Sequence, residues 1–308
     1  MTLLLTHLDA DLHETPPGHP EQVGRLIAVR EALADMDLAR ETPEEAGEEA
    51  LLRCHPRAHL DRLEAAAPAE GWAQLDADTY LSRGSLRAAR LAVGAALRAV
   101  DAVVAGEHRT AFVAMRPPGH HAEAEVPMGF CLYGTVAIAA KHALDHHGLS
   151  RVAVVDFDVH HGNGTQDLLW DEPRALFVST HQSPLWPGTG DASETGAQGN
   201  VLNVPLRPGT DGRAFRRAMT ERVLPRLDAF APELVLISAG FDAHRDDPLA
   251  QLEWEEADFA WATGRLCDVA ARHAGGRVVS CLEGGYDLHA LATSVAAHVE
   301  VLRERGNG

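Results

Sequence analysis

The sequence predicts an α/β fold in which a central parallel sheet is flanked by helices. Three observations lead to this prediction: short apolar runs of strand length recur along the chain, helical stretches lie between them, and polar residues follow four of the runs directly. Unbroken apolar runs are typical of strands covered on both faces, and their alternation with helices is typical of a parallel sheet. Neither a repeat nor a low-complexity linker divides residues 1–308, so we expect one domain.

The individual elements follow from local patterns. The run at 152–155 is short and β-branched, which favours a buried strand. The stretch 82–104 is rich in Ala, Leu and Arg and is followed by Gly106, a residue type that commonly ends helices. Residues 40–50 are acidic and weakly patterned, so we expect a surface segment there. In chain order, we predict a strand at 3–5, helices at 21–34 and 82–104, a strand at 111–115, a helix ending near 147, strands at 152–155, 175–179 and 201–204, a helix at 211–229, a strand at 234–238, a helix at 255–273 and a strand at 278–281.

Asp156, Asp158 and His160 directly follow the strand at 152–155, at alternate positions. Because side chains alternate along an extended chain, these three potential ligands should point to one side within roughly 7 Å of each other. Buried carboxylates and imidazoles are costly unless they are paired or bind a metal. The GNG stretch at 162–164 predicts a sharp turn, and Asn163 stands between the glycines where left-handed geometry is tolerated.

Three other predicted strands also end in polar residues, and the carboxyl ends of parallel strands meet at one crevice. Asp242 follows one of them and, with Asp158 and His160, would complete a three-ligand metal site with an open position. Zinc suits this donor set, and iron(II) or cobalt also fits it. The alternative for Asp242 is a helix N-cap.

The remaining strand ends supply groups for acid–base chemistry. His120 and His121 follow the strand at 111–115 and can transfer protons, with Asp156 and Asn163 as their orienting partners. Tyr286 stands beside two glycines and can donate a hydrogen bond to a developing oxyanion.

Together these residues resemble the histone deacetylase superfamily, in the form of a bacterial class II-like deacetylase or acetylpolyamine amidohydrolase relative. The resemblance runs in order over nearly the whole chain. It is carried by HPE at 19–21, RPPGHH at 116–121, GFC at 129–131, DFDVHHGNGT at 156–165, SAGFDAH at 238–244 and EGGY at 283–286.

The resemblance implies the three-layer arginase/deacetylase fold and zinc-dependent amide hydrolysis. Asp158, His160 and Asp242 would be the zinc ligands, His121 the general base and acid, and His120 its electrostatic partner. Tyr286 would be the oxyanion donor. Family members also bind potassium, which implies a second ion held by Asp156, Ser179 and Thr180 together with Asp158 and His160.

The resemblance further implies a substrate channel. Gly129 and Phe130 match its wall, and Leu185 or Trp186 is expected to line the other side. Leu249 stands where the polyamine-selective class IIb enzyme has a gatekeeper Glu, and an apolar residue there weakens the polyamine interpretation. Asp78 is expected to bind substrate backbone at the rim.

Composition narrows the partners and the compartment. Acidic residues outnumber Lys and Arg by 45 to 27, and the formal net charge of -18 disfavours nucleic acid and attracts cationic substrates. The four cysteines are widely spaced and suit a reducing cytoplasm. No signal sequence and no apolar run of membrane-spanning length occurs, so we expect neither export nor membrane insertion.

The expected substrate is an acetylated lysine in a peptide or protein, or an acylated small amine such as an acetylpolyamine. Two other functions stay open: an arginase-like ureohydrolase and a non-catalytic module that binds acyl-lysine. A ureohydrolase needs two metals bridged by additional Asp ligands, which the sequence lacks, although His120, Asp156 and His161 could hold a second metal. We interpret eight other histidines as surface or structural: His7, His13, His55, His59, His142, His146, His147 and His181.

Overall fold

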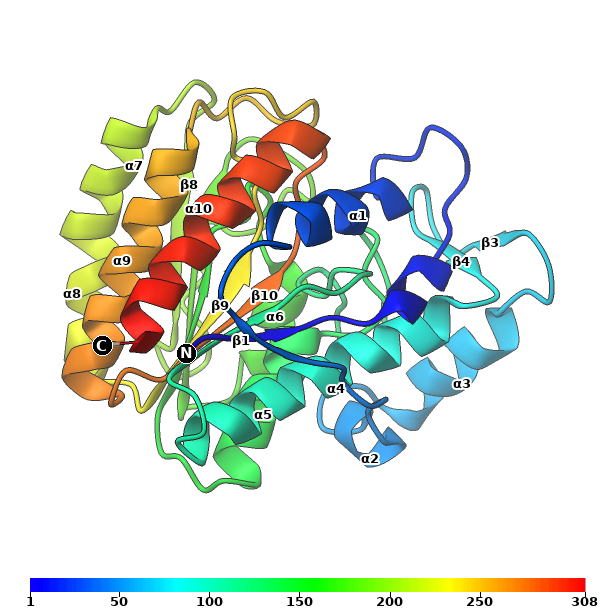
Figure 1. The fold of residues 1–308 in the computed structure, drawn as a ribbon, viewed down its shortest axis with the longest axis horizontal. Coiled ribbons are helices and arrows are strands. Elements are labelled where there is room, and N and C mark those ends of the chain that lie inside the picture. The colour runs from blue at the N-terminus through cyan, green and yellow to red at the C-terminus, as the bar shows by residue number, and fades with distance from the viewer. Residues whose placement is uncertain (308) are drawn as a thin grey trace.

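The computed structural model describes residues 1–307, and in this range the chain forms an eight-stranded sheet in which all pairs are parallel (Figure 1). The strand order is β2-β1-β5-β10-β9-β6-β7-β8. The inner strands are buried along their full length, as their unbroken apolar sequences predict. The strands are β1 (Leu3–Leu5), β2 (Ala39–Glu41), β5 (Thr110–Val113), β6 (Val152–Asp156), β7 (Ala175–Gln182), β8 (Val201–Leu206), β9 (Leu234–Ala239) and β10 (Val278–Leu282).

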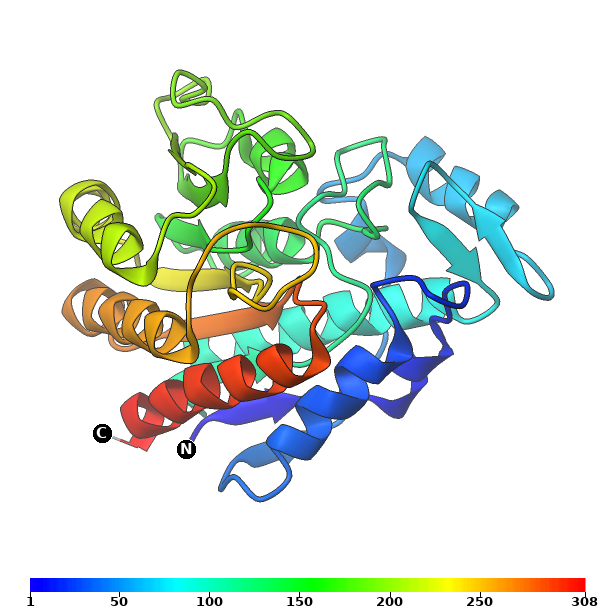
Figure 2. The same cartoon turned by 90° about the horizontal axis from the view of Figure 1, so that it is seen from above.

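Helices cover both faces of the sheet (Figure 2). One layer contains α1 (Val23–Ala32), α7 (Gly212–Ala218), α8 (Leu224–Phe230), α9 (Glu256–His273) and α10 (Leu288–Asn307). The opposite layer contains α4 (Ser85–Val104), α5 (Thr135–Asp145) and α6 (Asn163–Leu169), with α2 (Glu48–Leu51) beside α5. The predicted arrangement of a parallel sheet between two helical layers is therefore confirmed.

All seven predicted strands are present, and the differences concern elements with weak local patterns. The segment 40–50, predicted to be irregular surface, contributes the edge strand β2 and the short helix α2. The hairpin of β3 (Trp72–Gln74) and β4 (Tyr80–Ser82) was not predicted, and neither was α10. The remaining elements are α3 (Arg57–Ala66), the short 3-10 helix η1 (Leu8–Leu12) and the π-helical turn η2 (Met219–Val223) between α7 and α8.

Asn163 does not use the left-handed geometry that its position tolerates, because it is the first residue of α6 and has no positive φ. The neighbouring glycines serve close approach instead. A Cβ at Gly162 would lie 2.2 Å from Asp156 Oδ2, and a Cβ at Gly164 would lie 2.4 Å from the carbonyl oxygen of Ala122. The glycines allow α6 to pack directly against the segment that carries the histidine pair.

The register of the sheet brings the predicted strand ends together. Asp156 at the end of β6 lies opposite Ser179 of β7 and Ser238 of β9, and Ser238 lies opposite Cys281 of β10. Cys281 in turn pairs with Val113, the last residue of β5. The segments that follow these strands therefore start at one edge of the sheet.

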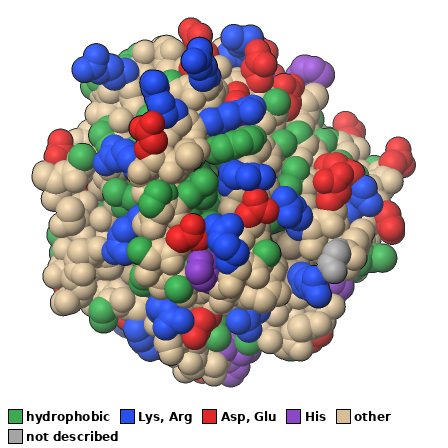
Figure 3. Space-filling model, turned by 90° about the vertical axis from the view of Figure 1, so that its left-hand side faces the viewer, with side chains coloured by type: hydrophobic (Ala, Val, Ile, Leu, Met, Phe, Trp, Pro, Cys, Tyr) green, Lys and Arg blue, Asp and Glu red, His purple; other side chains and the backbone are tan. Residues whose placement is uncertain are grey.

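The surface mixes charges of both signs. On the face that carries α7, α8 and α9, arginines lie among Asp and Glu side chains and apolar patches (Figure 3). Ion pairs there include Arg216 with Asp258 and Arg272 with Asp228. Along residues 1–307, none of the helices combines the length and the apolar character needed to cross a membrane.

Candidate active site

Asp158, His160 and Asp242 form a compact group beyond the ends of β6 and β9. One potential ligand atom from each lies within 4.8 Å of the other two. His160 Nδ1 lies 3.2 Å from Asp158 Oδ1 and 3.1 Å from Asp242 Oδ2. Both carboxylates are fully buried. Two carboxylates and one imidazole that converge in this way can hold a divalent cation and leave a position open.

The charges in this group fit a cation. Burial and the nearby Asp158 carboxylate raise the pKa of Asp242 to about 7. Burial alone would lower the pKa of His160, but its hydrogen bonds to the two carboxylates outweigh burial and raise the pKa to about 10. The site thus keeps protons near neutral pH to balance its buried negative charge, and a divalent ion can replace them.

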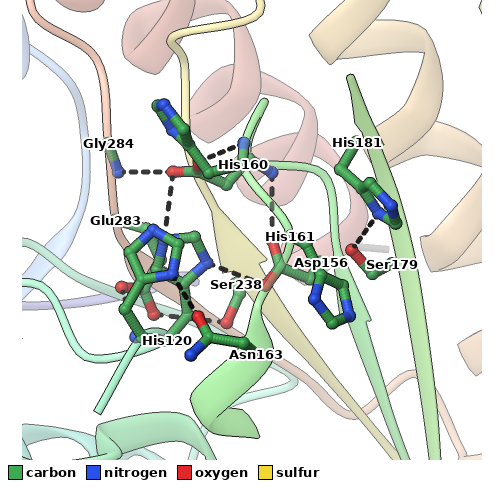
Figure 4. A network of polar contacts seen from close by, with 12 residues as sticks. His120, Asp156, His160, His161, Asn163, Ser179, His181, Ser238, Glu283 and Gly284 are labelled. Carbon is green, nitrogen blue, oxygen red and sulfur yellow. Dashed lines mark hydrogen bonds and ion pairs between the residues drawn. The ribbon is translucent and has the colours of Figure 1, made fainter. Parts of the chain in front are cut away.

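The backbone around the group leaves room only for the two carboxylates. A Cβ at Gly240 would lie 2.0 Å from Asp158 Oδ2, and a Cβ at Gly284 would lie within 2.5 Å of both carboxylates. The Gly284 N–H donates to Asp158 Oδ2 at 2.9 Å, and the Val159 N–H donates to Asp242 Oδ1 at 2.8 Å (Figure 4 shows the bond from Gly284). These amides fix the carboxylates so that their other oxygens face His160.

His120 lies beside this group as a charged imidazole. Its Nδ1 is 3.0 Å from Asp156 Oδ2, and its Nε2 is 3.7 Å from Asp158 Oδ2 (Figure 4). Burial alone would lower the pKa of His120, but the carboxylates of Asp158 and Asp156 outweigh burial and raise the pKa well above its ordinary value. His120 therefore carries a positive charge at neutral pH.

His121 has the opposite electrostatic environment. Its Nδ1 is 2.8 Å from the Asn163 side-chain oxygen, and its ring centroid is 3.8 Å from that of His120. Burial and the positive charges of His120 and His160 hold the pKa of His121 well below its ordinary value. Because an amide cannot supply the negative charge that Asp156 gives to His120, the two adjacent imidazoles differ in protonation. Neutral His121 can accept a proton.

Tyr286 lies across the same cavity and packs edge-on against Phe130. Burial holds the pKa of Tyr286 well above its ordinary value, so the hydroxyl keeps its proton and can donate a hydrogen bond. The Tyr286 N–H donates to Asp247 Oδ2 at 2.7 Å, which fixes this loop on one side.

Buried Arg25 fixes the Tyr286 loop on the other side, and sequence reasoning missed this residue. It donates to the carbonyl oxygens of Gly285 and Glu283 at 2.6 and 2.5 Å, and its guanidinium lies 4.9 Å from the Tyr286 ring centre. Its charge is balanced by Glu21, which also accepts two hydrogen bonds from buried Arg116. Two features of the sequence could have indicated this ion-pair cluster: the i,i+4 spacing of Glu21 and Arg25, and Arg116 shortly after β5.

Glu283 is a second residue whose role sequence reasoning missed. Its buried carboxylate accepts hydrogen bonds from the backbone N–H groups of Gly119 and His120 at 2.7 and 3.1 Å. It also accepts a hydrogen bond from the Ser238 hydroxyl at 3.2 Å (Figure 4). The end of β10 is thereby tied to the segment that carries the two histidines.

A cavity of about 360 Å³ leads to this group and is lined mainly by apolar and aromatic side chains. The residues predicted for the channel and its rim all line the cavity, with both Leu185 and Trp186 among them: Asp78, Gly129, Phe130, Leu185, Trp186 and Leu249. It is also lined by His19 and Tyr80, which were not predicted, and His160, His121 and Tyr286 complete its deep end. Gly129 has a positive φ of 55°, and a Cβ there would lie 2.5 Å from both His121 and Trp186. Only glycine lets the wall approach His121 this closely.

The residues predicted to hold potassium lie together on β6 and β7. Ser179 pairs with Asp156 in the sheet, and the Thr180 hydroxyl donates to the Asp156 carbonyl oxygen at 3.5 Å. The Ser179 hydroxyl is 2.9 Å from His181 Nδ1 (Figure 4). The segment therefore gathers hard oxygen atoms, the donor type that an alkali cation prefers, behind the Asp158 group.

His161 does not join a second metal group of the kind that a ureohydrolase would need. Its Nδ1 is 2.8 Å from the Thr189 hydroxyl and its Nε2 is 3.0 Å from the Gln166 side-chain oxygen, so both nitrogens have other partners. At this edge of the sheet, the only metal-ligand group found among residues 1–307 is that of Asp158, His160 and Asp242.

Comparison with known proteins identifies the family. The model of the histone deacetylase domain matches residues 19–302. The chain is 44% identical over 298 residues to the uncharacterized protein slr0245 of Synechocystis, covering 94% of this chain and 95% of that protein. It is 41% identical over 278 residues to the histone deacetylase-like amidohydrolase of Pseudomonas aeruginosa, covering 89% of this chain and 72% of that protein.

A solved structure agrees with the sequence comparisons. The crystal structure of the HDA15 HD domain matches with a TM-score of 0.92 and 33% identity, covering 98% of this chain and 91% of that chain. The fold is thus the predicted arginase/deacetylase fold, and the resemblance drawn from the motifs is confirmed. The chain belongs to the histone deacetylase family.

Proposed function

We propose that this protein is a zinc-dependent hydrolase that removes acetyl or other short acyl groups from the ε-amine of lysine side chains or from related amines. One observation carries the proposal: a three-ligand metal group, a neutral imidazole and a protonated tyrosine meet at the deep end of one apolar cavity. The names of the relatives, deacetylases and amidohydrolases, support the same chemistry.

Asp158, His160 and Asp242 would hold the zinc ion, for which iron(II) or cobalt could substitute. A divalent ion at this position would supply Lewis acidity, which lowers the pKa of water toward about 7 and polarises a carbonyl. Potassium would bind beside it through Asp156, Ser179 and Thr180, together with Asp158 and His160.

The protein's own groups would then perform the proton transfers. Neutral His121 takes a proton from the attacking water and later delivers one to the leaving amine. Positively charged His120, held by Asp156, stabilises the negative charge that develops on the substrate and keeps His121 neutral beforehand. The Tyr286 hydroxyl donates to the developing oxyanion. Asn163 orients His121 without adding charge.

The cavity walls support an acyl-lysine substrate. Phe130, Leu185 and Trp186 offer apolar surface for the methylene stem of a lysine, which carries no polar group between its backbone and its amide. Apolar Leu249 at the cavity supplies no negative charge for the second amine of a polyamine, which makes an acetylpolyamine the less favoured alternative. The net charge of -18 attracts cationic substrates of both classes, lysine-rich peptides and polyamines.

The proposal includes a single catalytic domain over residues 1–308 and a cytoplasmic location. In support of the first, the family model spans residues 19–302 and the site draws groups from α1 to the end of β10. In support of the second, four free, buried cysteines suit a reducing compartment.

The test is to compare hydrolysis of a fluorogenic acetyl-lysine peptide with that of N-acetylputrescine, before and after metal chelation. We expect peptide turnover that chelation abolishes. Preference for N-acetylputrescine would move the protein to the polyamine alternative. Turnover of neither compound, with acyl-lysine still bound, would contradict the proposed hydrolase and favour a binding module.

A further inference from the structure

We propose a second metal site, specific for a late first-row divalent ion such as zinc, formed by Asp101, His142, His146 and His147. One potential ligand atom from each residue lies within 4.8 Å of the others, and none of the four contributes to the site described above. The proposal does not depend on the proposed function.

The site lies at the opposite edge of the sheet from the active-site cavity. Asp101 is in the last turn of α4, which leads into the start of β5, and His142 is in the last turn of α5, which leads into the start of β6. The active-site residues follow the carboxyl ends of the same strands. Helices α4 and α5 pack side by side, and Figure 1 shows them along the lower part of the molecule. A metal bound here would therefore join two helices far from the catalytic groups.

The three histidines converge because of where α5 ends. His142 and His146 are four residues apart, a spacing that places two imidazoles on one helix face and is used by metal-binding helices. Their rings lie parallel, with an interplanar angle of 10° and centroids 4.7 Å apart. The helix ends at Asp145 and the chain turns, so that the His147 ring stands at 89° to His142 and 86° to His146, with centroids 5.2 and 4.9 Å away.

Asp101 supplies the fourth ligand from the neighbouring helix. His142 Nε2 lies 2.7 Å and His147 Nε2 lies 2.6 Å from the same oxygen, Asp101 Oδ1. Two imidazole nitrogens thus already point at one carboxylate oxygen, and a third imidazole lies against both. Small side-chain rotations would bring the four ligand atoms around one ion.

The donor set and its exposure indicate which ion fits. Three imidazole nitrogens and one carboxylate oxygen suit zinc in tetrahedral geometry, and copper, nickel and cobalt bind similar sets. Four protein ligands would close the coordination sphere, which is the arrangement of a structural rather than a catalytic zinc. His142 is buried, whereas His146 is exposed and Asp101 and His147 are partly exposed, so an ion can enter from solvent. The alternative is a purely hydrogen-bonded contact in which Asp101 ties His142 and His147 together.

The zinc content of the protein distinguishes a metal site from a purely hydrogen-bonded contact. The full-length protein is stripped with a chelator and dialysed against micromolar zinc, and bound zinc is then counted per chain. We expect one zinc ion fewer in His146→Ala than in the wild type, which is one against two where the active-site group is also filled. Since His146 is exposed and makes only ring contacts, this variant should fold normally. The matched control is His289→Ala, which removes an exposed histidine at the start of α10 and should keep both ions.

A second measurement uses the active-site variant Asp242→Ala to separate this site from the catalytic one. In this background, zinc should still raise the melting temperature, and the additional change Asp101→Asn should abolish that shift. Asn keeps the size of Asp101 and a hydrogen-bond acceptor but lacks the charge. We therefore expect the zinc affinity to fall by at least about 10- to 100-fold, which is the loss typical of replacing a residue that contacts only the metal ligands. An equal zinc count in wild type and His146→Ala, or a melting shift that survives Asp101→Asn, would overturn the proposal.

Discussion

Replacing Asn163 with Asp tests whether His121 is the base of the proposed mechanism while His120 stays charged. The Asn163 oxygen lies 2.8 Å from His121 Nδ1, and the pKa of His121 is held well below its ordinary value by burial and by the charges of His120 and His160. In the proposed mechanism turnover needs neutral His121, so the wild-type rate should be full above the pKa of His121 and should fall as the pH drops through it. Asn163→Asp places a negative charge where the structure has a neutral amide.

The size of the effect follows from the geometry. Opposite unit charges about 4 Å apart interact by about 4 kcal/mol at an effective dielectric constant of about 20. That energy corresponds to about 3 pKa units at 1.36 kcal/mol per unit. Burial of the new carboxylate and its repulsion by Glu123, which accepts from the Asn163 side chain at 2.8 Å, reduce the gain. We therefore expect the pKa of His121 to rise by about 1–3 units.

The assay is the pH dependence of kcat/KM on an acetyl-lysine peptide. In Asn163→Asp, the acid limb should move to higher pH by about 1–3 units, so that activity is lost earlier on acidification and is recovered as the pH rises. Asn163→Ala is the control, because it removes the hydrogen bond without adding charge and should not move this limb upward. An acid limb of Asn163→Asp at or below the wild-type position would refute the assignment of His121 as the base.

Three further predictions concern the groups around the cavity. Tyr286→Phe should lower kcat by about 10²–10³ with little change in KM, and an unchanged kcat would remove its hydroxyl from the mechanism. Gly284→Ala should lose one bound zinc ion per chain, because the new Cβ would lie 2.4 and 2.5 Å from carboxylate oxygens of Asp242 and Asp158. The control Gly264→Ala, whose Cβ would have its nearest neighbour at 3.9 Å, should keep its zinc. Equal zinc contents of the two variants would contradict the argument that the Cβ crowds the carboxylates. Arg25→Met should lower the free energy of unfolding in urea by about 3 kcal/mol, because buried Glu21 loses a charged partner, and a loss near zero would show that the ion pair is not needed.

The strands and the main site groups could be predicted because their signals are local. A β-branched run at 152–155 followed at once by alternating Asp and His side chains needs no knowledge of the rest of the chain. The meeting of parallel strand ends then brings Asp242 to the same place, as the structure has it. The expected extended chain through Asp158 and His160 is wrong, because β6 ends at Asp156 and the chain bends at 158–160. The edge strand β2 was missed because a half-exposed strand has a sequence as polar as that of a loop.

Features made by contacts between distant segments could not be predicted in this way. Arg25 lies 260 residues from Gly285 in the chain, and nothing near either residue indicates that they meet. The contact between Asp101 and His142 could not be predicted for the same reason, since Asp101 precedes His142 by 41 positions and lies on another helix. Asn163 was assigned to a turn from its glycine neighbours, although those glycines serve close packing of α6.

The central claim is that turnover depends on a metal held by Asp158, His160 and Asp242. The most direct test is to add zinc stepwise to metal-free His146→Ala protein, which lacks the second proposed site, while measuring hydrolysis of an acetyl-lysine peptide. The account predicts that activity rises in proportion to zinc up to one ion per chain, and that Asp242→Ala in the same background stays inactive. Full activity of the metal-free protein, or equal activation of the Asp242→Ala variant, would contradict it.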